Sequence, residues 1–309
     1  MKSNYLSDTD FYSSAELTDN YKKFIQESSL KKIFLGYPII DNLMRGLRPK
    51  EVLTIIAETG IGKSALTQNI LMQHSKNTKE LTLYFTLEMS SEEVFERMIQ
   101  VELKVSGYDV ENKFLKEDKN FIQSCNEVAR KNKDFVLIEK RIDINRLNEV
   151  IEFLENHFNR KAGLICIDHL LLLENYKFDT NEYQKVSDNM KSIKSYSLES
   201  KIPFIIVSQI SRNSSRAGID LFAGKGSGEV ENSSNFVLAL SKINFKNAAD
   251  YGLSQKIVDD KNESKISLLS LRLLKNRRGR TDGNCIIEFD RKSLKMFQSE
   301  LNELNDFKD

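Results

Sequence analysis

A glycine-rich turn after an apolar run carries the strongest chemical signal in the sequence. The run 52–56 (VLTII) leads into the turn 57–62, and Lys63-Ser64 opens a stretch with helical character. In this arrangement backbone N–H groups cradle phosphates, the lysine reaches the β- and γ-phosphate oxygens, and the serine hydroxyl ligates Mg²⁺. A turn that binds nothing is the alternative. We predict a nucleotide site formed by Ala57, Glu58, Thr59, Gly60, Ile61, Gly62, Lys63, Ser64 and Ala65.

Three polar side chains follow other apolar runs at the positions where strands should end. Asp168 ends one run, and a carboxylate at the tip of a buried strand is where a ligand of Mg²⁺ belongs. Glu88 lies just beyond a second run, where it can polarise the water that attacks a γ-phosphate. Gln209 ends a third run and can sense that phosphate. The alternatives are a strand-end cap for Asp168, a solvated residue before a helix start for Glu88, and a plain strand-end amide for Gln209.

Apolar runs and helical stretches alternate between residue 52 and Gln209. Continuously apolar strands separated by helices imply a parallel sheet covered on both faces. After about residue 235 the strands have short connections, which predicts an antiparallel extension of the same sheet, with the polar segment 245–264 as a mobile excursion. The predicted strands are 52–56, 81–85, 135–138, 164–167, 204–208, 235–243, 266–275, 284–289 and 294–297, and the predicted helices are 63–75, 91–103, 113–131, 145–158 and 182–199.

The composition is that of one folded domain without a global charge signal. The 309 residues are 40% hydrophobic and 29% charged with a net charge of +1, so any nucleic acid must bind a local patch. Three scattered cysteines exclude a disulfide framework and a zinc site and fit a reducing compartment. No signal peptide and no apolar run near the roughly 18 residues of a membrane span are found. We therefore expect a cytoplasmic protein without membrane contact.

The two ends of the chain are expected to lie outside the main domain, which spans 36–297. Residues 1–35 form an arm whose segment 14–28 is a short helix with one apolar stripe that includes Leu17, Tyr21 and Phe24. A helix of this length is marginal alone, so it must pack on its own domain or on a neighbouring subunit. The charged segment 298–309 is expected to be a frayed tail.

The three histidines have ordinary interpretations. His169 follows Asp168 and is expected to pack beside the site and not to ligate a metal. His74 and His157 fall on polar faces of predicted helices, where we expect them to be solvated.

Five segments occur in a recognisable order: 36–62 (GYPIIDNLMRGLRPKEVLTIIAETGIG), 86–90 (TLEMS), 164–173 (LICIDHLLLL), 202–212 (IPFIIVSQISR) and 274–281 (LKNRRGRT). Together they resemble the motor domain of the DnaB-type ring helicases. A leucine of the family is replaced by Ile40, whereas several members share the alanine at the position of Ala57, where the strict phosphate-loop pattern has glycine. The resemblance implies an α/β fold with a RecA-like P-loop NTPase core, a mainly parallel central sheet flanked by helices and a C-terminal antiparallel extension.

The resemblance implies a role for each residue that matches a motif of the family. Lys63 and Ser64 would bind the phosphates and Mg²⁺ of ATP, and Asp168 would support the metal. Glu88 would be the base that activates water, and Gln209 would sense the γ-phosphate.

Lys275 and Arg277 match a basic motif of the family, in which these side chains reach the nucleotide of the adjacent subunit. An arginine finger supplied in trans can raise the rate about 10³–10⁵-fold. The resemblance therefore implies a homo-oligomer, most simply a hexameric ring, whose active sites form between subunits. On charge alone, a solvated basic turn between two strands is the simpler interpretation.

The resemblance also implies that single-stranded DNA contacts the loops after Gln209. Glycines let backbone N–H groups approach phosphates, and Lys225 supplies charge. No aromatic residue interleaves 224–229, which indicates contact with the DNA backbone and not base stacking. The family usually has an arginine-led loop here followed by acidic residues, so this chain departs from it, and a flexible surface loop is the alternative. The candidate DNA-binding residues are Arg212, Lys225, Gly226, Ser227 and Gly228.

The function expected from these features is an ATP-dependent, ring-forming DNA helicase that translocates on single-stranded DNA in replication, with a plasmid, phage or other mobile element as one candidate source. A primase or a helicase loader is a candidate partner of such a helicase, although this sequence shows only the arm where full-length members of the family carry an N-terminal helical domain for primase contact. A RecA-like DNA- or protein-binding ATPase without unwinding activity is the first alternative. A non-enzymatic nucleotide-binding assembly factor is the second, although a decayed ATPase usually loses one of Lys63, Glu88, Asp168, Lys275 and Arg277.

Overall fold

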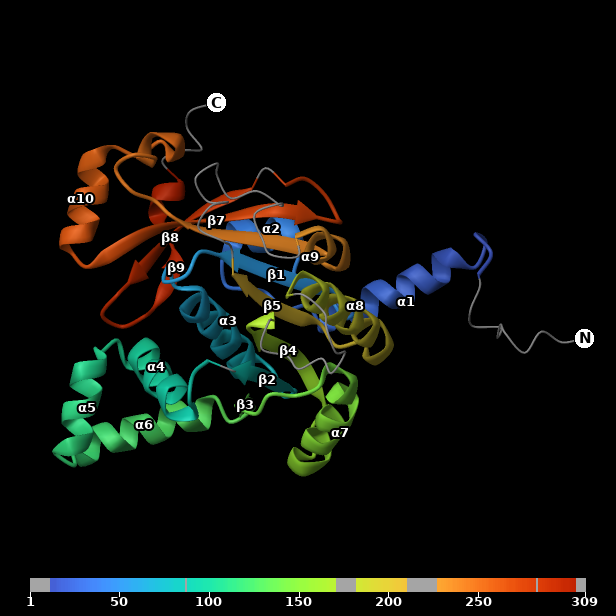
Figure 1. Ribbon diagram of the computed structural model, residues 1–309, viewed down its shortest axis with the longest axis horizontal. Coiled ribbons are helices and arrows are strands. Elements are labelled where there is room, and N and C mark those ends of the chain that lie inside the picture. The colour runs from blue at the N-terminus through green and yellow to red at the C-terminus, as the bar shows by residue number, and fades with distance from the viewer. Residues whose placement is uncertain (1–11, 87, 171–181, 210–226, 282, 304–309) are drawn as a thin grey trace, which may run out of the picture.

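The computed structural model describes residues 12–86, 88–170, 182–209, 227–281 and 283–303. Within them a sheet of nine strands, in the order β3-β2-β4-β5-β1-β6-β7-β8-β9, forms the centre of the molecule (Figure 1). Strands β1 to β6 pair in parallel, and β7, β8 and β9 extend the sheet by antiparallel pairing. The predicted fold class, a RecA-like core with an antiparallel extension, is confirmed. The strands are β1 (Val52–Ala57), β2 (Leu81–Thr86), β3 (Phe135–Ile138), β4 (Ala162–Asp168), β5 (Phe204–Gln209), β6 (Phe236–Lys242), β7 (Ile266–Asn276), β8 (Asn284–Asp290) and β9 (Met296–Gln298).

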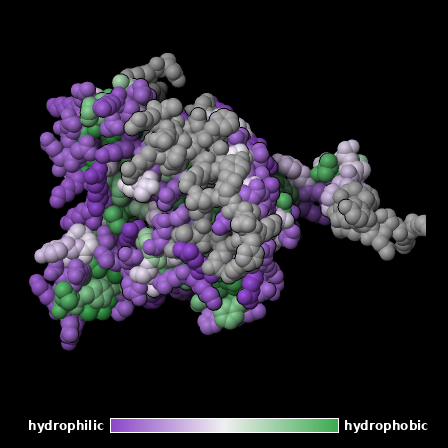
Figure 2. Space-filling view, viewed as in Figure 1, coloured by the Kyte–Doolittle hydropathy of each residue, from purple (hydrophilic) through white to green (hydrophobic). Residues whose placement is uncertain are grey.

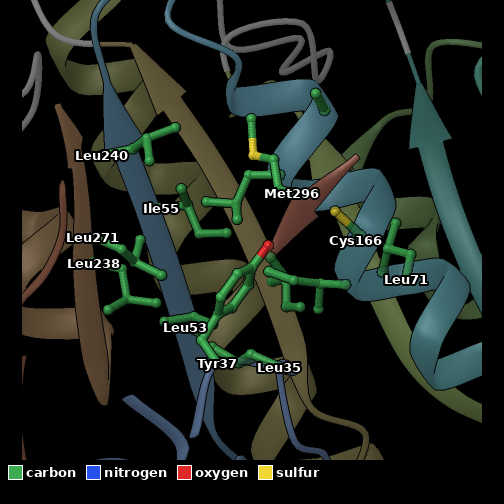
Figure 3. Packing of buried hydrophobic residues seen from close by; sticks show 14 of the residues in the cluster. Leu35, Tyr37, Leu53, Ile55, Leu71, Cys166, Leu238, Leu240, Leu271 and Met296 are labelled. Atoms are coloured by element: carbon green, nitrogen blue, oxygen red, sulfur yellow. The ribbon is translucent and has the colours of Figure 1, made fainter. Parts of the chain in front are cut away.

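Helices cover both faces of the sheet because the central strands are apolar at consecutive positions. On one face, Leu53 and Ile55 of β1 share a buried cluster with Leu71 of the helix that follows the glycine-rich turn (Figure 3). On the other face, Ile165 of β4 shares a second cluster with Ile193. The helices are α1 (Leu17–Leu30), α2 (Pro38–Met44), α3 (Lys63–Asn77), α4 (Ser91–Leu103), α5 (Gly107–Leu115), α6 (Lys119–Lys131), α7 (Leu147–Phe158), α8 (Glu182–Ser200), α9 (Ser227–Ser233) and α10 (Gln255–Glu263), with 3-10 turns η1 (Ile144–Arg146), η4 (Ala248–Tyr251) and η5 (Glu300–Asn302).

The single helix predicted over 113–131 is wrong, because the chain forms two helices there. Helix α5 ends at Leu115, and Glu117 has a positive φ of 50°, which a continuous helix cannot contain. The Asp118 side chain then accepts a hydrogen bond from the Phe121 backbone N–H at 3.1 Å and caps α6. The helical pattern is interrupted here because aspartate favours the capping position over the interior of a helix.

The segment 245–264 is also not the excursion that its polarity suggests. It contains η4 and α10, and Ala248, Leu253 and Val258 are buried in a small cluster with Leu268 of β7. Three widely spaced apolar residues are enough to anchor the segment, although they do not form an apolar run in the sequence.

Both ends of the chain contribute more to the domain than expected. Ile33 and Leu35, which the sequence placed in the arm, are buried, and Ile33 pairs with Leu47 in an antiparallel bridge. Asn302, placed in the frayed tail, is buried, and its side chain bonds the backbone N–H and carbonyl of Ile286 at 2.8 Å each. Helix α1 forms, two or three residues later than predicted, and stands away from the body of the molecule (Figure 2). Among the described residues, no helix is both long and apolar enough to span a bilayer.

Candidate nucleotide-binding site

The glycine-rich turn connects the last residue of β1, Ala57, to the first residue of α3, Lys63. Gly60 and Gly62 have positive φ angles of 83° and 114°, which residues with a side chain rarely adopt. A Cβ on Gly62 would in addition lie 2.8 Å from Met296 Cε of β9. Ala57 is buried within the strand and has no positive φ, so the alanine fits where the strict pattern has glycine. The backbone of this turn therefore has the strand–turn–helix shape that the sequence predicts.

Lys63 lies over this turn with its amine near the carbonyls that a bound phosphate would replace. Its Nζ donates to Ala57 O at 3.3 Å and to Glu58 O at 3.2 Å, and the side chain is buried. Burial lowers the pKa of Lys63, and the nearby carboxylates of Asp168 and Glu88 act in the opposite direction. Gly62 has no side chain to cap α3, so the N–H groups of its first turn are available to an anion.

Asp168 is held at the tip of β4 by a residue that the sequence did not single out. The Tyr84 hydroxyl donates to Asp168 Oδ2 at 2.9 Å, and both side chains are buried. Burial and the adjacent Asp168 raise the pKa of Tyr84, so the phenol stays protonated and remains a donor. Tyr84 lies within an apolar strand, where a tyrosine usually indicates packing alone. The hydroxyl fixes one carboxylate oxygen and leaves the other for a ligand.

Glu88 reaches the same place from the end of β2. Its Oε1 lies 2.9 Å from His169 Nδ1, and one ligand atom each of Glu88, Asp168 and His169 all lie within 4.8 Å of one another. The glutamate side chain is 45% exposed, whereas that of His169 is 10% exposed. The structure thus brings Glu88 and Asp168 together beside Lys63, as the sequence predicts.

Gln209 completes the set at the carboxyl ends of the strands. It ends β5 and is paired in register with Ala57, the residue from which the turn begins. Its side chain is half-buried. We name the edge of the sheet that carries Ala57, Asp168 and Gln209 the phosphate edge.

Lys275 and Arg277 lie at the opposite edge of the sheet. Lys275 pairs with Val237 near the start of β6, whereas the phosphate edge lies at the carboxyl end of the parallel strands. The Lys275 amine donates to Glu231 O, and Arg277 Nη2 donates to Asn232 O at 2.6 Å. We name this the finger edge. Because β1 has six residues, the two edges are about 20 Å apart, so these side chains do not join the phosphate site of their own subunit.

The neighbouring arginine explains why the basic turn is ordered. The Arg278 side chain is 12% exposed, forms an ion pair with Glu51 at 3.2 Å and lies over the Phe236 ring at 4.9 Å. Burial lowers the pKa of Arg278 to about 10, against the attraction of Glu51. The segment is therefore anchored to the domain through Arg278, whereas Arg277, Gly279 and Arg280 of the same turn are exposed.

Comparison with known proteins identifies the family of the chain. A model of the DnaB-like helicase C-terminal domain matches residues 5–298. The chain belongs to this family. A probable replicative DNA helicase of Trieres chinensis is 25% identical over 303 residues, which cover 95% of this chain and 64% of the relative. A probable plasmid replicative DNA helicase of Chlamydia muridarum is 25% identical over 211 residues, 67% of this chain and 46% of the relative.

Solved structures show the same fold for this DnaB-like domain. One structure, described as an ATPase domain, has a TM-score of 0.76 at 17% identity and covers 94% of this chain and 100% of its own. A DnaB-like replicative helicase described with its interactions with primase has a TM-score of 0.75 at 18% identity, with coverage of 94% and 68%. This chain spans about half to two thirds of the length of the curated relatives.

The residues of the DnaB-like domain fit a nucleotide with Mg²⁺. Oxygen donors are what this cation prefers, and the phosphate edge supplies the Ser64 hydroxyl and the free oxygen of Asp168. Glycines hold the backbone open at the turn, and Lys63 offers a positive charge. These observations are consistent with a site for a phosphate-bound metal.

The predicted DNA contacts are only partly within the described residues. Arg212, Lys225 and Gly226 lie outside them. Ser227 and Gly228 form the start of α9 and not part of an extended loop, which differs from the expectation for 224–229. Glu229, the next residue, gives this first turn the acidic character that favours a helix start.

Proposed function

We propose that this domain is the ATP-hydrolysing motor of a ring-forming DNA helicase that translocates on single-stranded DNA during replication. The observation that carries the proposal is the division of the catalytic groups between two edges of the sheet: Lys63, Asp168 and Glu88 gather on one, and Lys275 and Arg277 lie on the other. A chain with this division needs a second copy to complete its site. Relatives named as replicative DNA helicases, one of them from a plasmid, support the choice of reaction.

The proposed chemistry is hydrolysis of the γ-phosphate of ATP. Glu88 takes a proton from the attacking water, whose oxygen bonds to the γ-phosphorus while the bond to the bridging oxygen breaks. Lys63 holds the negative charge that grows on the phosphate oxygens. Ser64 and Asp168 would hold Mg²⁺, which when bound would neutralise charge on the phosphates, and the Tyr84 hydroxyl keeps Asp168 oriented for that purpose. Gln209, beside the turn, responds to the presence of the γ-phosphate.

Assembly into a ring would supply the remaining charge. If one subunit presents its finger edge to the phosphate edge of the next, Lys275 and Arg277 leave the carbonyls of Glu231 and Asn232 and reach the neighbour's nucleotide. A head-to-tail contact of this kind uses two different surfaces and closes into a ring when the rotation allows it. We propose a hexamer.

Two exposed apolar surfaces support such assembly. On α1, Leu17 and Tyr21 are 49% and 63% exposed, and they form a stripe on a helix that stands away from the body (Figure 1). On α5, Leu115 is 76% exposed and Phe114 is 40% exposed, where apolar atoms gather at the lower left of Figure 2. We propose that α1 of one subunit packs on its neighbour, as the arm at 1–35 was expected to do, because a helix this short is marginal without a packing surface.

Single-stranded DNA is proposed to pass the loops that precede α9, with Arg212, Lys225, Gly226, Ser227 and Gly228 as contacts. Helix α9 follows these loops directly in the sequence, and its last carbonyls accept hydrogen bonds from Lys275 and Arg277. A change in the contacts of Lys275 and Arg277 can therefore be passed through α9 to the loops proposed to bind DNA. A primase or a loader remains a proposed partner, and the cytoplasm, where replication of such elements occurs, is the proposed location.

The test is the ATPase rate of the chain with and without single-stranded DNA, followed by unwinding of a forked duplex. We expect DNA to raise the rate and the chain to separate the fork only with hydrolysable ATP. Glu88→Gln should bind nucleotide and form the same oligomer, but it should hydrolyse ATP only at a slow residual rate and should not unwind. Hydrolysis that ignores DNA would overturn the motor and favour a regulatory ATPase, and hydrolysis stimulated by DNA without unwinding would favour a mediator.

A further inference from the structure

His169 contacts Glu88 directly and has no part in the reaction as described above. It follows Asp168 at the tip of β4, so the strand itself places its ring beside the phosphate edge. Its Nδ1 lies 2.9 Å from Glu88 Oε1. The imidazole is buried, whereas the Glu88 side chain is 45% exposed.

Among the described residues, none offers the buried Nδ1 of His169 a better hydrogen-bond partner than Glu88. His169 Nδ1 makes no aligned hydrogen bond with any of them, because the 2.9 Å contact with Glu88 has the distance but not the direction of one. A buried polar nitrogen without a hydrogen bond is costly. A small rotation of the exposed Glu88 side chain would align the pair, so the carboxylate is the group that completes the environment of the imidazole.

We propose that His169 is a positioning residue for the base: its imidazole holds the Glu88 carboxylate beside Asp168 and Lys63, in the orientation that accepts a proton from water. The inference rests on the proposed function of Glu88. In the step itself the proton passes from water to the Glu88 carboxylate, and the bridging oxygen of the leaving ADP keeps the electron pair of the broken P–O bond. The part proposed for His169 is to donate from Nδ1 to the Glu88 carboxylate and not to act as the base.

Positioning is needed because charge repulsion would otherwise turn the Glu88 carboxylate away from Asp168. The carboxyl groups of Glu88 and Asp168 lie within 4.8 Å of each other, and like charges at that separation repel. Lys63 attracts both, but its amine is also required by the phosphates. A rigid donor on the side of Glu88 away from solvent counters the repulsion in the same way that the Tyr84 hydroxyl holds Asp168.

The experiment compares His169→Leu, His169→Gln and His169→Asn in steady-state ATPase assays with single-stranded DNA. In asparagine the amide nitrogen is attached to Cγ, as Nδ1 is in histidine, whereas glutamine moves it one bond further out. We expect kcat to fall about 10- to 10²-fold for the leucine and glutamine variants, with KM for ATP and equilibrium binding of a fluorescent ADP analogue unchanged. The asparagine variant should retain most of kcat. His157→Asn, an exposed histidine on α7, is the matched control for the substitution and should match the wild type.

A second comparison asks whether His169 acts through Glu88. In single-turnover assays His169→Leu should slow the wild type but add nothing to Glu88→Gln, because the effect of a positioning residue disappears with the group that it positions. Equal losses in both backgrounds would overturn the proposal, as would weaker binding of ADP with Mg²⁺, which would make His169 a ligand of the metal.

The outcomes separate this inference from the proposed function. If Glu88→Gln is inactive and His169→Leu keeps the wild-type kcat, only the role of His169 is overturned. If the wild type does not hydrolyse ATP, or if Glu88→Gln hydrolyses at the wild-type rate, both are overturned together.

Discussion

The phosphate edge and the finger edge of the sheet differ in how their charged residues are held. At the phosphate edge, Asp168 is buried, and its partners Tyr84 and Lys63 are buried side chains of neighbouring elements. At the finger edge, Lys275 and Arg277 donate to backbone carbonyls of α9, which are neutral and replaceable acceptors. Charge-assisted contacts with phosphate are stronger than bonds to neutral carbonyls. One edge is therefore preorganised within the subunit, and the other is ready to exchange its partners.

The two halves of the proposed active site therefore have different structural requirements. The preorganised half depends on the fold of a single chain, because parallel strands bring their carboxyl ends to one edge. The exchangeable half needs only an anchor for the backbone, which Arg278 supplies through Glu51 and Phe236. Variants of the two edges should for this reason complement each other, whereas variants of the same edge should not.

Loss of the finger gives the largest expected effect. Arg277→Ala should lower kcat about 10³- to 10⁵-fold, since a finger in trans stabilises charge that develops only in the transition state. Lys63→Ala should lower it about 10²-fold or more and weaken nucleotide binding as well. Both rates are measured with single-stranded DNA in excess.

Mixing the two inactive variants then tests the assignment of the edges to different subunits. In randomly mixed rings about one quarter of the interfaces pair an intact Lys63 with an intact Arg277, so part of the ATPase activity should return. A mixture of Lys63→Ala with Glu88→Gln, both on the phosphate edge, is the control and should stay inactive. Failure of the first mixture to recover activity, although native mass spectrometry shows mixed oligomers, would place both edges in one subunit.

Loss of the α1 stripe should weaken assembly by an intermediate amount. Leu17→Ser with Tyr21→Ser removes two exposed apolar side chains, and anchors of this kind contribute about 2 kcal/mol each when buried in an interface. The concentration at which the oligomer dissociates, measured by sedimentation with ADP present, should rise about 10²- to 10³-fold. Lys22→Ser with Gln26→Ser, on the polar face of the same helix, should leave it unchanged. An unchanged dissociation for the stripe variant, with normal helicity, would leave α1 without a role in assembly.

The smallest expected effect concerns His74, which we expected to be solvated and which is not. It is half-buried at the end of α3, its Nδ1 contacts Thr82 Oγ1 at 2.7 Å, and burial lowers its pKa to about 4. Below about pH 6.5 the unfolded chain binds a proton that the folded chain refuses until about pH 4. Stability should therefore fall as the pH is lowered through this window, by about 1 kcal/mol at pH 5.5 and about 3 kcal/mol in the limit.

Chemical unfolding at several pH values measures this effect. His74→Gln cannot titrate, so its free energy of unfolding should depend less on pH between 6.5 and 4 than that of the wild type. His157→Gln, at an exposed position of α7, is the control. Equal pH dependence of the two variants would mean that His74 opens to solvent, and that the amino-terminal end of β2 is less rigid than the contact with Thr82 indicates.

Much of the phosphate edge could be predicted because its signals are local. The run 52–56, the turn with Gly60 and Gly62, and the polar residues at strand ends are each readable within a few positions, and parallel topology then places them together. The boundary between α5 and α6 was missed because a capping aspartate competes with a helical pattern that continues on both sides. The roles of Arg212, Lys225 and Gly226 stay predictions.

The order and type of neighbouring residues are enough to predict the class of the fold, the glycine-rich turn and the carboxylates proposed to act beside it. The folded chain is needed to see that the Tyr84 hydroxyl faces Asp168 and that His169 faces Glu88. It is also needed to see that Lys275 and Arg277 lie at the edge opposite Lys63. The physical reason is that side-chain contacts between strands, and the direction in which an antiparallel strand returns, depend on pairing across the sheet and not on spacing along the chain.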